Sequence, residues 1–252
     1  MSSEVETSLT VSAATLDHGQ TIVRDSSTSV GMTEKLFATT HVFHDIDSRS
    51  AAMNMAIDEA LLERAELPSI RFYRWNHPAL SFGYFGEFAD LEDERRDVVR
   101  RWTGGGIVFH DDDLTYSIVI PANDAAFGES STSMYERTHD ALRRALAMIG
   151  THAELAERAA PKLSESCFAN AVRADVLCNG RKIAGAAQRR TRRGLLQQGS
   201  IQGIDLSADF ERSLARELSE DFCERTLEGS IVERAGHIAA AKYATEAWTR
   251  RR

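Results

Sequence analysis

Long apolar runs are missing from this chain of 252 residues, and so is an excess of positive charge. Apolar stretches such as 117–121 are far shorter than the roughly 20 residues that a membrane-spanning helix needs. The net charge of −8 argues against a general nucleic-acid-binding surface. Because the hydrophobic content of 42% can still build a sizeable core, we expect a soluble globular protein without nucleic-acid or membrane partners.

Cysteine is also scarce, and no C-x-x-C pair is present among Cys167, Cys178 and Cys223. This odd number predicts neither a disulfide framework nor a zinc site, and we expect no bound metal. The polar, acidic N-terminus does not resemble a signal peptide, which predicts a reducing cytoplasm. Lysine is rarer than arginine, so a lysine inside a motif attracts attention; the lysines are Lys35, Lys162, Lys182 and Lys242.

The chain divides into an extension and one domain. Residues 1–35 are rich in serine and threonine and have no sustained periodicity, which predicts a disordered N-terminal extension. We expect one folded domain over residues 36–252, with no internal repeat.

Strand-like segments dominate the middle of this domain and helical segments its flanks. Helices are predicted from about residue 53 to 64 (with Asp58 on the polar face), 134–149, 207–218 and 231–248. Asp47, Ser48 and Ser50 are candidate N-caps of the first helix, and Gly150 is a candidate C-cap of the second. Strands are predicted at 42–43, 70–75, 79–84, 107–109, 115–120, 172–177, 182–187 and 195–201. The turn at 76–78 would join two strands in a hairpin, and Asn179-Gly180 is a strong hairpin signal. This order predicts an α+β fold with a mixed, mostly antiparallel sheet flanked by helices.

A run of glycines is the first candidate for a binding site. Arg100 and Arg101 lead into the glycines at 104–106, and strand-like residues with His110 follow. Glycines let the backbone approach a ligand closely, although the same pattern also fits a flexible turn. The flanking charges favour a pocket wall, but the glycines alone do not name the ligand.

A cysteine and a lysine are the second candidate. Cys167 lies in a short polar loop where a thiol is accessible, whereas Cys178 ends an apolar run and Cys223 lies in a helix-like region, which predicts small buried side chains. A reactive thiol needs a nearby cation or base, and Lys182 is the best candidate. An exposed hairpin lysine is the simpler interpretation, and spacing cannot prove that the two residues meet.

Several separated motifs resemble one family. These are the helix 54–61, the segments 71–73 and 80–84, the glycine run, and residues 180–201 with the sequence GRKIAGAAQRR followed by LLQQGSI. In this order they resemble the lipoate-protein ligase and octanoyltransferase superfamily, over roughly residues 37–205. The resemblance is closest to LipM-type octanoyltransferases, because Cys167 precedes the lysine of G-R-K-I-A-G at the spacing typical of that group.

The resemblance implies a function and a set of site residues. Cys167 would take octanoyl from octanoyl-[acyl carrier protein] as a thioester and pass it to a lysine of a lipoyl domain, such as the glycine cleavage H protein. Lys182 would lower the pKa of the thiol, and no cofactor would be required. The resemblance places further residues in the substrate pocket: Arg101, Thr103, Gly104, Gly105, Gly106, Ile107, Val108, Phe109, His110 and Gly185.

One position departs from the LipM-type pattern and keeps alternatives open. Members of that group usually carry arginine at the place of Gly106, whereas a glycine here resembles ATP-dependent lipoate ligases. A ligase would use ATP and Mg²⁺ to form an acyl-adenylate and would not need Cys167. An amidotransferase that moves octanoyl between lipoyl domains and a non-catalytic acyl-binding protein are further alternatives.

Overall fold

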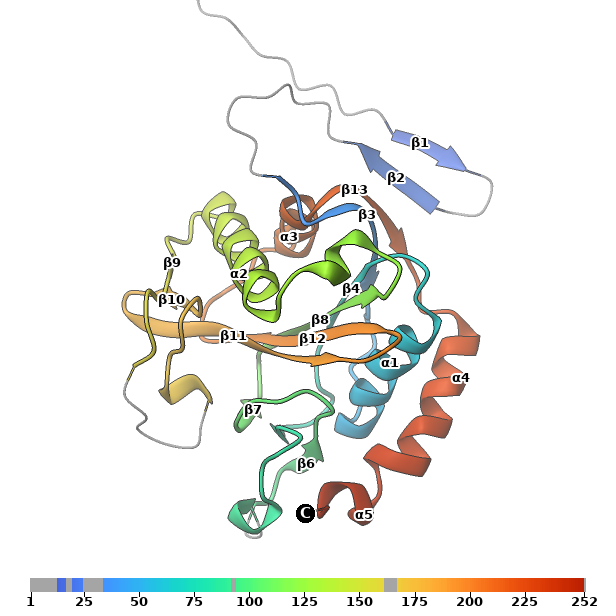
Figure 1. The fold of residues 1–252 in the computed structure, drawn as a ribbon, viewed down its shortest axis with the longest axis vertical. Helices are drawn as coiled ribbons and strands as arrows, with labels where there is room; N and C mark the ends of the chain where they lie inside the picture. Colours follow the sequence, from blue (N-terminus) through green and yellow to red (C-terminus); the bar gives the residue numbers. More distant parts are fainter. Residues whose placement is uncertain (1–12, 17–19, 25–33, 92–93, 161–166, 252) are drawn as a thin grey trace, which may run out of the picture.

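The structure is a computed structural model that describes residues 13–16, 20–24, 34–91, 94–160 and 167–251. Figure 1 shows a large sheet through the middle of the molecule, with helices on both of its sides. None of the described helices is long and apolar enough to cross a membrane.

Ten of the described strands form the large sheet, in the order β1-β2-β13-β3-β4-β8-β12-β11-β10-β9. Their bounds are β1 Ala13–Leu16, β2 Gln20–Arg24, β3 Phe37–His44, β4 Ser69–Tyr73, β8 Leu114–Pro121, β9 Glu154–Leu155, β10 Val176–Cys178, β11 Arg181–Arg190, β12 Gly194–Ile201 and β13 Ser219–Arg225. Among the described strand pairs of this sheet, β3 with β13 and β3 with β4 are parallel, and the others are antiparallel. The mixed, mostly antiparallel α+β fold predicted from the sequence is therefore confirmed.

A small second sheet has the order β6-β5-β7. Its strands are β5 Ala79–Phe82, β6 Asp97–Arg100 and β7 Val108–His110. The helices are α1 Ala51–Arg64, α2 Ser131–Met148, α3 Phe210–Leu218, α4 Gly229–Ile238 and α5 Glu246–Thr249. Short 3₁₀ segments are η1 Phe88–Leu91, η2 Ala125–Gly128 and η3 Cys167–Ala169, and η4 (Ala239–Tyr243) is π-helical.

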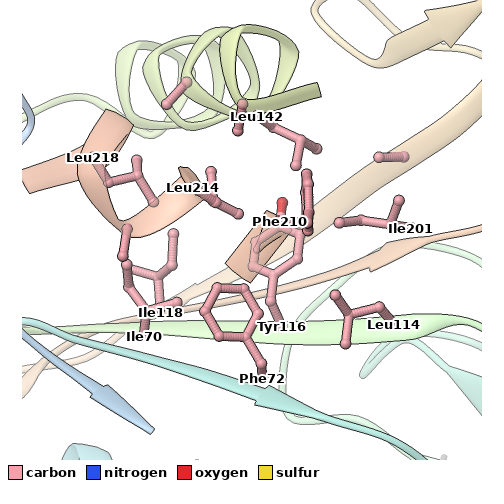
Figure 2. Packing of buried hydrophobic residues seen from close by; sticks show 14 of the residues in the cluster. Ile70, Phe72, Leu114, Tyr116, Ile118, Leu142, Ile201, Phe210, Leu214 and Leu218 are labelled. Atoms are coloured by element: carbon pink, nitrogen blue, oxygen red, sulfur yellow. The ribbon is translucent and has the colours of Figure 1, made fainter. Parts of the chain in front are cut away.

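The main hydrophobic core lies between the large sheet and helices α2 and α3. In Figure 2, Ile70 and Phe72 of β4 point toward Leu142 of α2 and Leu214 of α3. These side chains are almost completely buried, and each such burial contributes about 1.5–3 kcal/mol. Alternate residues of the same strands face the opposite side of the sheet, where α1 and α4 pack.

Helix α1 begins where the sequence predicts, but its polar face is not where the pattern places it. Ser50 caps the helix by accepting a hydrogen bond from the backbone of Met53. Asp58, expected on the solvent face, is completely buried, so that prediction was wrong. Because α4 covers α1 from outside and the sheet covers it from inside, the solvent-exposed stripe is narrow.

The hairpin predicted between 70–75 and 79–84 does not form. Strand β4 already pairs with β3 and β8, so it has no free edge for β5. Strand β5 pairs with β6 and β7 in the small sheet instead. In the same way β7 and β8 follow each other in the chain but belong to different sheets.

Strand β13 was not predicted, and it contains Cys223, which the sequence placed in a helix-like region. It pairs in parallel with β3, which is almost two hundred residues away in the chain. A pairing between such distant segments leaves only a weak local signal. Cys178 and Cys223 are also half-buried rather than fully buried.

Two short strands lie within the segment predicted to be disordered. Strands β1 and β2 pair with each other, and β2 also pairs with β13 at the edge of the sheet. An open sheet edge offers hydrogen-bond partners that the local composition does not reveal. The rest of residues 1–33 lies outside the described part, and the domain boundary near residue 36 stays a prediction.

Candidate active site

A pocket lies between the large sheet and the glycine loop, residues 101–107, which connects β6 to β7. Its cavity volume is about 50 Å³, and its lining is mostly apolar with a few polar groups. Apolar pockets with a few convergent polar side chains are the usual form of small-molecule sites. This pocket is therefore the candidate active site.

The structure brings several of the predicted site residues together in the pocket lining. From the glycine loop and β7 come Arg101, Gly105, Val108 and His110, and from β11 come Lys182 and Gly185. The two groups are separated by about eighty residues in the sequence and meet because the small sheet faces β11 and β12.

Three further predicted residues support the loop without lining the pocket. The hydroxyl of Thr103 donates to Oε1 of Gln198 at 2.8 Å, and Gln198 does line the pocket. The carbonyls of Gly104 and Gly106 accept hydrogen bonds from Nη2 of Arg101 at 3.0 and 2.9 Å. Arg101 thus stabilises the curved conformation of the glycine loop through hydrogen bonds to the carbonyls of the loop itself.

Two predicted residues point elsewhere. Ile107 packs against the small apolar cluster of Leu80 and Phe82. The ring of Phe109 is 38% exposed and lies 5.0 Å from the guanidinium carbon of Arg96. Neither side chain lines the pocket, so a contact with a bound acyl chain stays a prediction for both.

Cys167 lies in η3, and its side chain is outside the described part of the structure. Segment η3 packs against β11, and the next residue, Phe168, lines the pocket. Its ring centroid is 5.4 Å from Nζ of Lys182. The backbone of Cys167 is thus close to the lysine, while the pairing of the two side chains stays a prediction.

A β-bulge turns Lys182 toward the pocket. Strand β10 pairs Val176 with Ala184 but Leu177 with Lys182, so Ile183 is an extra residue in β11. Ile183 and Ala184 are both buried in the main core, and Lys182 therefore shares a face with Gly185. A Cβ atom at position 185 would lie only 2.6 Å from Cε of Lys182. The glycine leaves the space that the lysine side chain occupies.

Lys182 is held in this position by a buried carboxylate. Its Nζ lies 2.8 Å from Oδ2 of Asp175, with the two side chains 7% and 0% exposed. An ammonium in such a dry place needs a counter-charge, because desolvation disfavours the charged form. The pair therefore places a charged group at the wall of an otherwise apolar pocket.

A buried polar network around Asp58 holds two of the pocket-lining residues, Tyr73 and Gln198. Asp58 accepts hydrogen bonds from Arg71, Tyr73, Ser117 and Gln198, at distances from 2.7 to 3.1 Å. These partners come from β4, β8 and β12, so one carboxylate ties α1 to three strands. Burial raises the pKa of Tyr73 well above its usual value, and the negative charge of Asp58 raises it further. The hydroxyl of Tyr73 therefore stays protonated and donates its hydrogen bond.

A second chain of hydrogen bonds runs through His110. Its Nδ1 lies 2.9 Å from Asp113 and its Nε2 lies 2.7 Å from Oγ of Ser81. Burial is the largest cause that lowers the pKa of His110, so the imidazole is neutral at physiological pH. The ring of Trp75 stacks on it at 3.9 Å between centroids.

This chain has the connectivity of a Ser-His-Asp triad, but its environment indicates a supporting role. Ser81 is completely buried, and its oxygen accepts a hydrogen bond from Nη1 of Arg101 at 2.7 Å. Although Ser81 borders the pocket, its oxygen is already engaged by both His110 and Arg101, so it is not free to act as a nucleophile. The chain instead fixes Arg101, which in turn fixes the glycine loop.

Two glycines allow the glycine loop to pack tightly on β5. Gly105 has a φ of +86°, a conformation that L side chains rarely adopt. A Cβ atom on Gly83 would lie 1.9 Å from the carbonyl oxygen of Gly105. Any side chain at position 83 would thus push the loop away from the small sheet.

Sequence reasoning did not single out several residues of this site. Met55, Tyr73, Trp75, Ser81, Thr115, Gln198 and Ser200 line the pocket, together with Phe168 and small residues of β11 and β12. One signal could have found some of them, since a polar side chain in the middle of an apolar strand, such as Ser81 or Gln198, needs a buried partner. Among the described residues, no cluster of three or more histidine, cysteine, aspartate or glutamate side chains could hold a metal ion.

Comparison with known proteins gives the family of this fold and site. Residues 50–232 match the lipoyl protein ligase A/B catalytic domain. The chain belongs to this family. The glycine loop, the Asp58 network and the strand that carries Lys182 all lie within the matched residues.

Within the lipoyl protein ligase A/B family, curated relatives carry the name octanoyltransferase LipM. The protein from Oceanobacillus iheyensis is 41% identical over 164 residues, which is 61% of this chain and 60% of that one. The protein from Kyrpidia tusciae is 35% identical over 221 residues, or 79% of this chain and 80% of that one.

Solved structures of the family have the same fold. A lipoate-protein ligase A bound with ATP has a TM-score of 0.65 at 22% identity, covering 84% of this chain and 98% of that one. A bipartite lipoate protein ligase from Thermoplasma acidophilum has a TM-score of 0.62 at 22% identity, covering 84% and 96%. At these identities the likeness concerns the fold alone.

Proposed function

We propose that this protein is an octanoyltransferase that moves an octanoyl group from an acyl carrier protein to a lysine of a lipoyl domain through a thioester on Cys167. The observation that carries the proposal is the buried Lys182 in the pocket wall, against which the segment that begins at Cys167 packs. The relatives named octanoyltransferase LipM support the same activity.

The first half-reaction transfers the acyl group to the enzyme. The thiolate of Cys167 attacks the thioester carbonyl of the donor, the new carbon–sulfur bond forms, and the carrier leaves as a thiol with the proton that Cys167 gave up. The ammonium of Lys182 stabilises the thiolate and the oxyanion that develops on the carbonyl. The apolar pocket beside the glycine loop takes the hydrocarbon chain.

The second half-reaction produces the amide. The neutral amine of the acceptor lysine attacks the acyl-cysteine carbonyl, the carbon–sulfur bond breaks, and the amine proton returns to the thiolate of Cys167. The reaction consumes one thioester and forms one amide, with no net change in oxidation state. It needs neither ATP nor a metal ion, and the acceptor is a lipoyl-domain protein.

The test is intact-protein mass spectrometry after mixing the protein with octanoyl-acyl carrier protein in the absence of ATP. We expect an octanoyl adduct that maps to Cys167 and disappears in the Cys167→Ser variant. Cys223→Ser is the matched control, because Cys223 lies in β13 away from the pocket, and its adduct should equal that of the unchanged protein.

The opposite outcome would identify a ligase. If no adduct forms, but ATP with free octanoate or lipoate acylates a lipoyl domain, the thioester mechanism is wrong and Cys167 is not the nucleophile. Transfer that persists undiminished in Cys167→Ser would contradict the proposal in the same way.

A further inference from the structure

The Lys182–Asp175 pair is part of a larger arrangement that helix α2 supports. Oδ1 of Asp175 accepts a hydrogen bond from the hydroxyl of Tyr135 at 2.5 Å, and Oδ2 accepts one from the backbone N–H of Val172 at 2.6 Å. The carboxylate thus has donors on both oxygens besides the ammonium of Lys182. Such a carboxylate is held in one orientation.

Ala174, the residue just before Asp175, has a strained backbone conformation that helps to set the direction of the Asp175 side chain. Ala174 has a φ of +66°, which costs an alanine roughly 1–2 kcal/mol. Its carbonyl accepts a hydrogen bond from Nδ1 of His139 at 2.7 Å, and its N–H donates to the carbonyl of Ala156 at 2.7 Å. Strained residues persist where the surroundings overdetermine them, and they are common at functional sites.

Tyr135 and His139 are one helical turn apart on α2, so they support this turn from the same face of the helix. Their rings contact each other edge to face, with centroids 4.1 Å apart. The hydroxyl of Tyr135 also accepts a hydrogen bond from the backbone of Ala186, which lines the pocket. Helix α2 therefore links the carboxylate to the strand that carries Lys182.

Three described titratable side chains that interact with the pair, Tyr135, Tyr116 and His139, are neutral at physiological pH. Burial is the first cause that raises the pKa of Tyr135 and of Tyr116 far above the usual value, and the charge of Asp175 adds to both shifts. Burial lowers the pKa of His139 to about 4. The opposite charges of Lys182 and Asp175 therefore lie next to side chains that carry no charge.

We infer that Asp175, anchored by Tyr135 of α2, is a positioning residue that holds the Lys182 ammonium at the pocket wall and keeps it cationic. The inference rests on the proposed function for the role of Lys182 in thioester chemistry. Asp175 does not line the pocket, so it acts through the lysine and not on the substrate. The bulge at Ile183 and the missing side chain at Gly185 complete this placement.

The experiment compares Asp175→Asn, Tyr135→Phe and a control, Asp140→Asn. Asp140 lies on the same helix and pairs with Arg143 at 2.8 Å and also with Arg144 on a partly exposed surface, so the control removes two ion pairs away from the pocket. Trace labelling of Lys182 with acetic anhydride, followed by mass spectrometry across a pH series, measures when its amine becomes reactive. Alkylation of Cys167 by iodoacetamide across the same pH series and the rate of octanoyl transfer complete the readouts.

We expect Asp175→Asn to make Lys182 reactive at a lower pH, because a dry ammonium without its carboxylate favours the neutral amine. Alkylation of Cys167 should then require a higher pH, and transfer should fall about 10–100-fold, as when an outer partner of an active-site group is removed. Tyr135→Phe should change all three readouts in the same direction by less, and Asp140→Asn should change none.

Unchanged labelling of Lys182 in a folded Asp175→Asn protein would overturn the inference. A thermal melt and circular dichroism establish that the variant is folded, and if it is not, Tyr135→Phe supplies the same comparison with the carboxylate retained. The labelling readout does not depend on acyl transfer. If the unchanged protein forms no octanoyl adduct on Cys167, the proposed function fails while the labelling still decides the role of Asp175.

Discussion

Two buried ion pairs in this protein use the same chemistry for different ends. Beneath helix α1, the guanidinium of Arg71 lies between Asp45 and Asp58 at 2.7 and 2.9 Å and is completely buried. In the pocket wall, Lys182 pairs with the carboxylate of Asp175, and its side chain is 7% exposed. The first has its charge enclosed by protein on every side, whereas the second presents its charge to a substrate.

A structural charge and a functional charge differ here in residue type and in what holds them. Arginine has a rigid fork that satisfies several acceptors at once, and Arg71 uses it to join α1, β4 and the chain after β3. Lysine is a compact charge on a flexible stem, and Lys182 needs a bulge, a glycine and Asp175 to hold it in place. Exposure to the pocket, and not burial by itself, indicates the functional pair.

The largest effect should come from breaking the pair beneath α1. Arg71→Met leaves Asp58 and Asp45 without their shared counter-charge, and removing one partner of a buried pair costs about 3–5 kcal/mol. We expect urea unfolding to show that loss of stability. Lys182→Met should cost less stability but stop octanoyl transfer. Equal losses of stability in the two variants would contradict the distinction.

The second largest effect should be a loss of stability in acid, through His139, which supports the turn before Asp175. His139 has an ordinary pKa of 6.5 and a pKa of about 4 in the fold, because it is buried. As the pH falls below 6.5, His139 is protonated in the unfolded chain before it is protonated in the folded protein. Its contribution to the free energy of unfolding is therefore complete above pH 6.5 and is lost toward pH 4, by up to about 3 kcal/mol.

The variant His139→Gln separates this contribution from that of other groups. Glutamine can still donate to the carbonyl of Ala174 but does not titrate. Urea unfolding of both proteins at pH 7 and pH 4.5 should show a smaller loss in the variant. The same loss in both would mean that His139 does not titrate as its burial implies.

A third change acts on the position of Lys182 without touching its charge. Gly185→Ala would place a Cβ atom 2.6 Å from Cε and 2.7 Å from Nζ of the lysine, whose flexible end must move. A displacement of about 1 Å at a reacting centre costs about a hundredfold in rate. We expect that loss in single-turnover transfer with little change in melting temperature, and full activity would show that the lysine position is not critical.

The smallest effect concerns the strained residue before Asp175. Ala174→Gly removes the steric penalty of a φ of +66°, although glycine adds entropy to the unfolded chain. We expect the free energy of unfolding to rise by about 1 kcal/mol, measured by urea titration. A loss of stability would mean that the backbone at this position is not strained.

Local chemistry was enough to predict much of the fold. Asn179 and Gly180 have positive φ values and join β10 to β11 as the hairpin signal indicates. Ser50 begins α1, and Gly150, with a φ of +82°, follows the end of α2. These features depend on residues a few positions apart, and the glycine loop was recognised for the same reason.

Contacts between distant segments decided the rest. Strands β5 and β7 do not pair with β4 and β8, their neighbours in the chain, because β4 and β8 already have strand partners on both edges. They form the small sheet instead, and this sheet provides one wall of the pocket. Asp58 lies on the apparent solvent face of its helix, yet it is completely buried and is the centre of a hydrogen-bond network with β4, β8 and β12.

Lys182 shows the division most clearly. The local pattern alone predicts that a rare lysine follows a hairpin turn and lies three positions before a glycine in the same strand. Simple alternation would send their side chains to opposite faces. The tertiary structure placed them on the same face, because both Ile183 and Ala184 bury their side chains in the core and force a bulge between them.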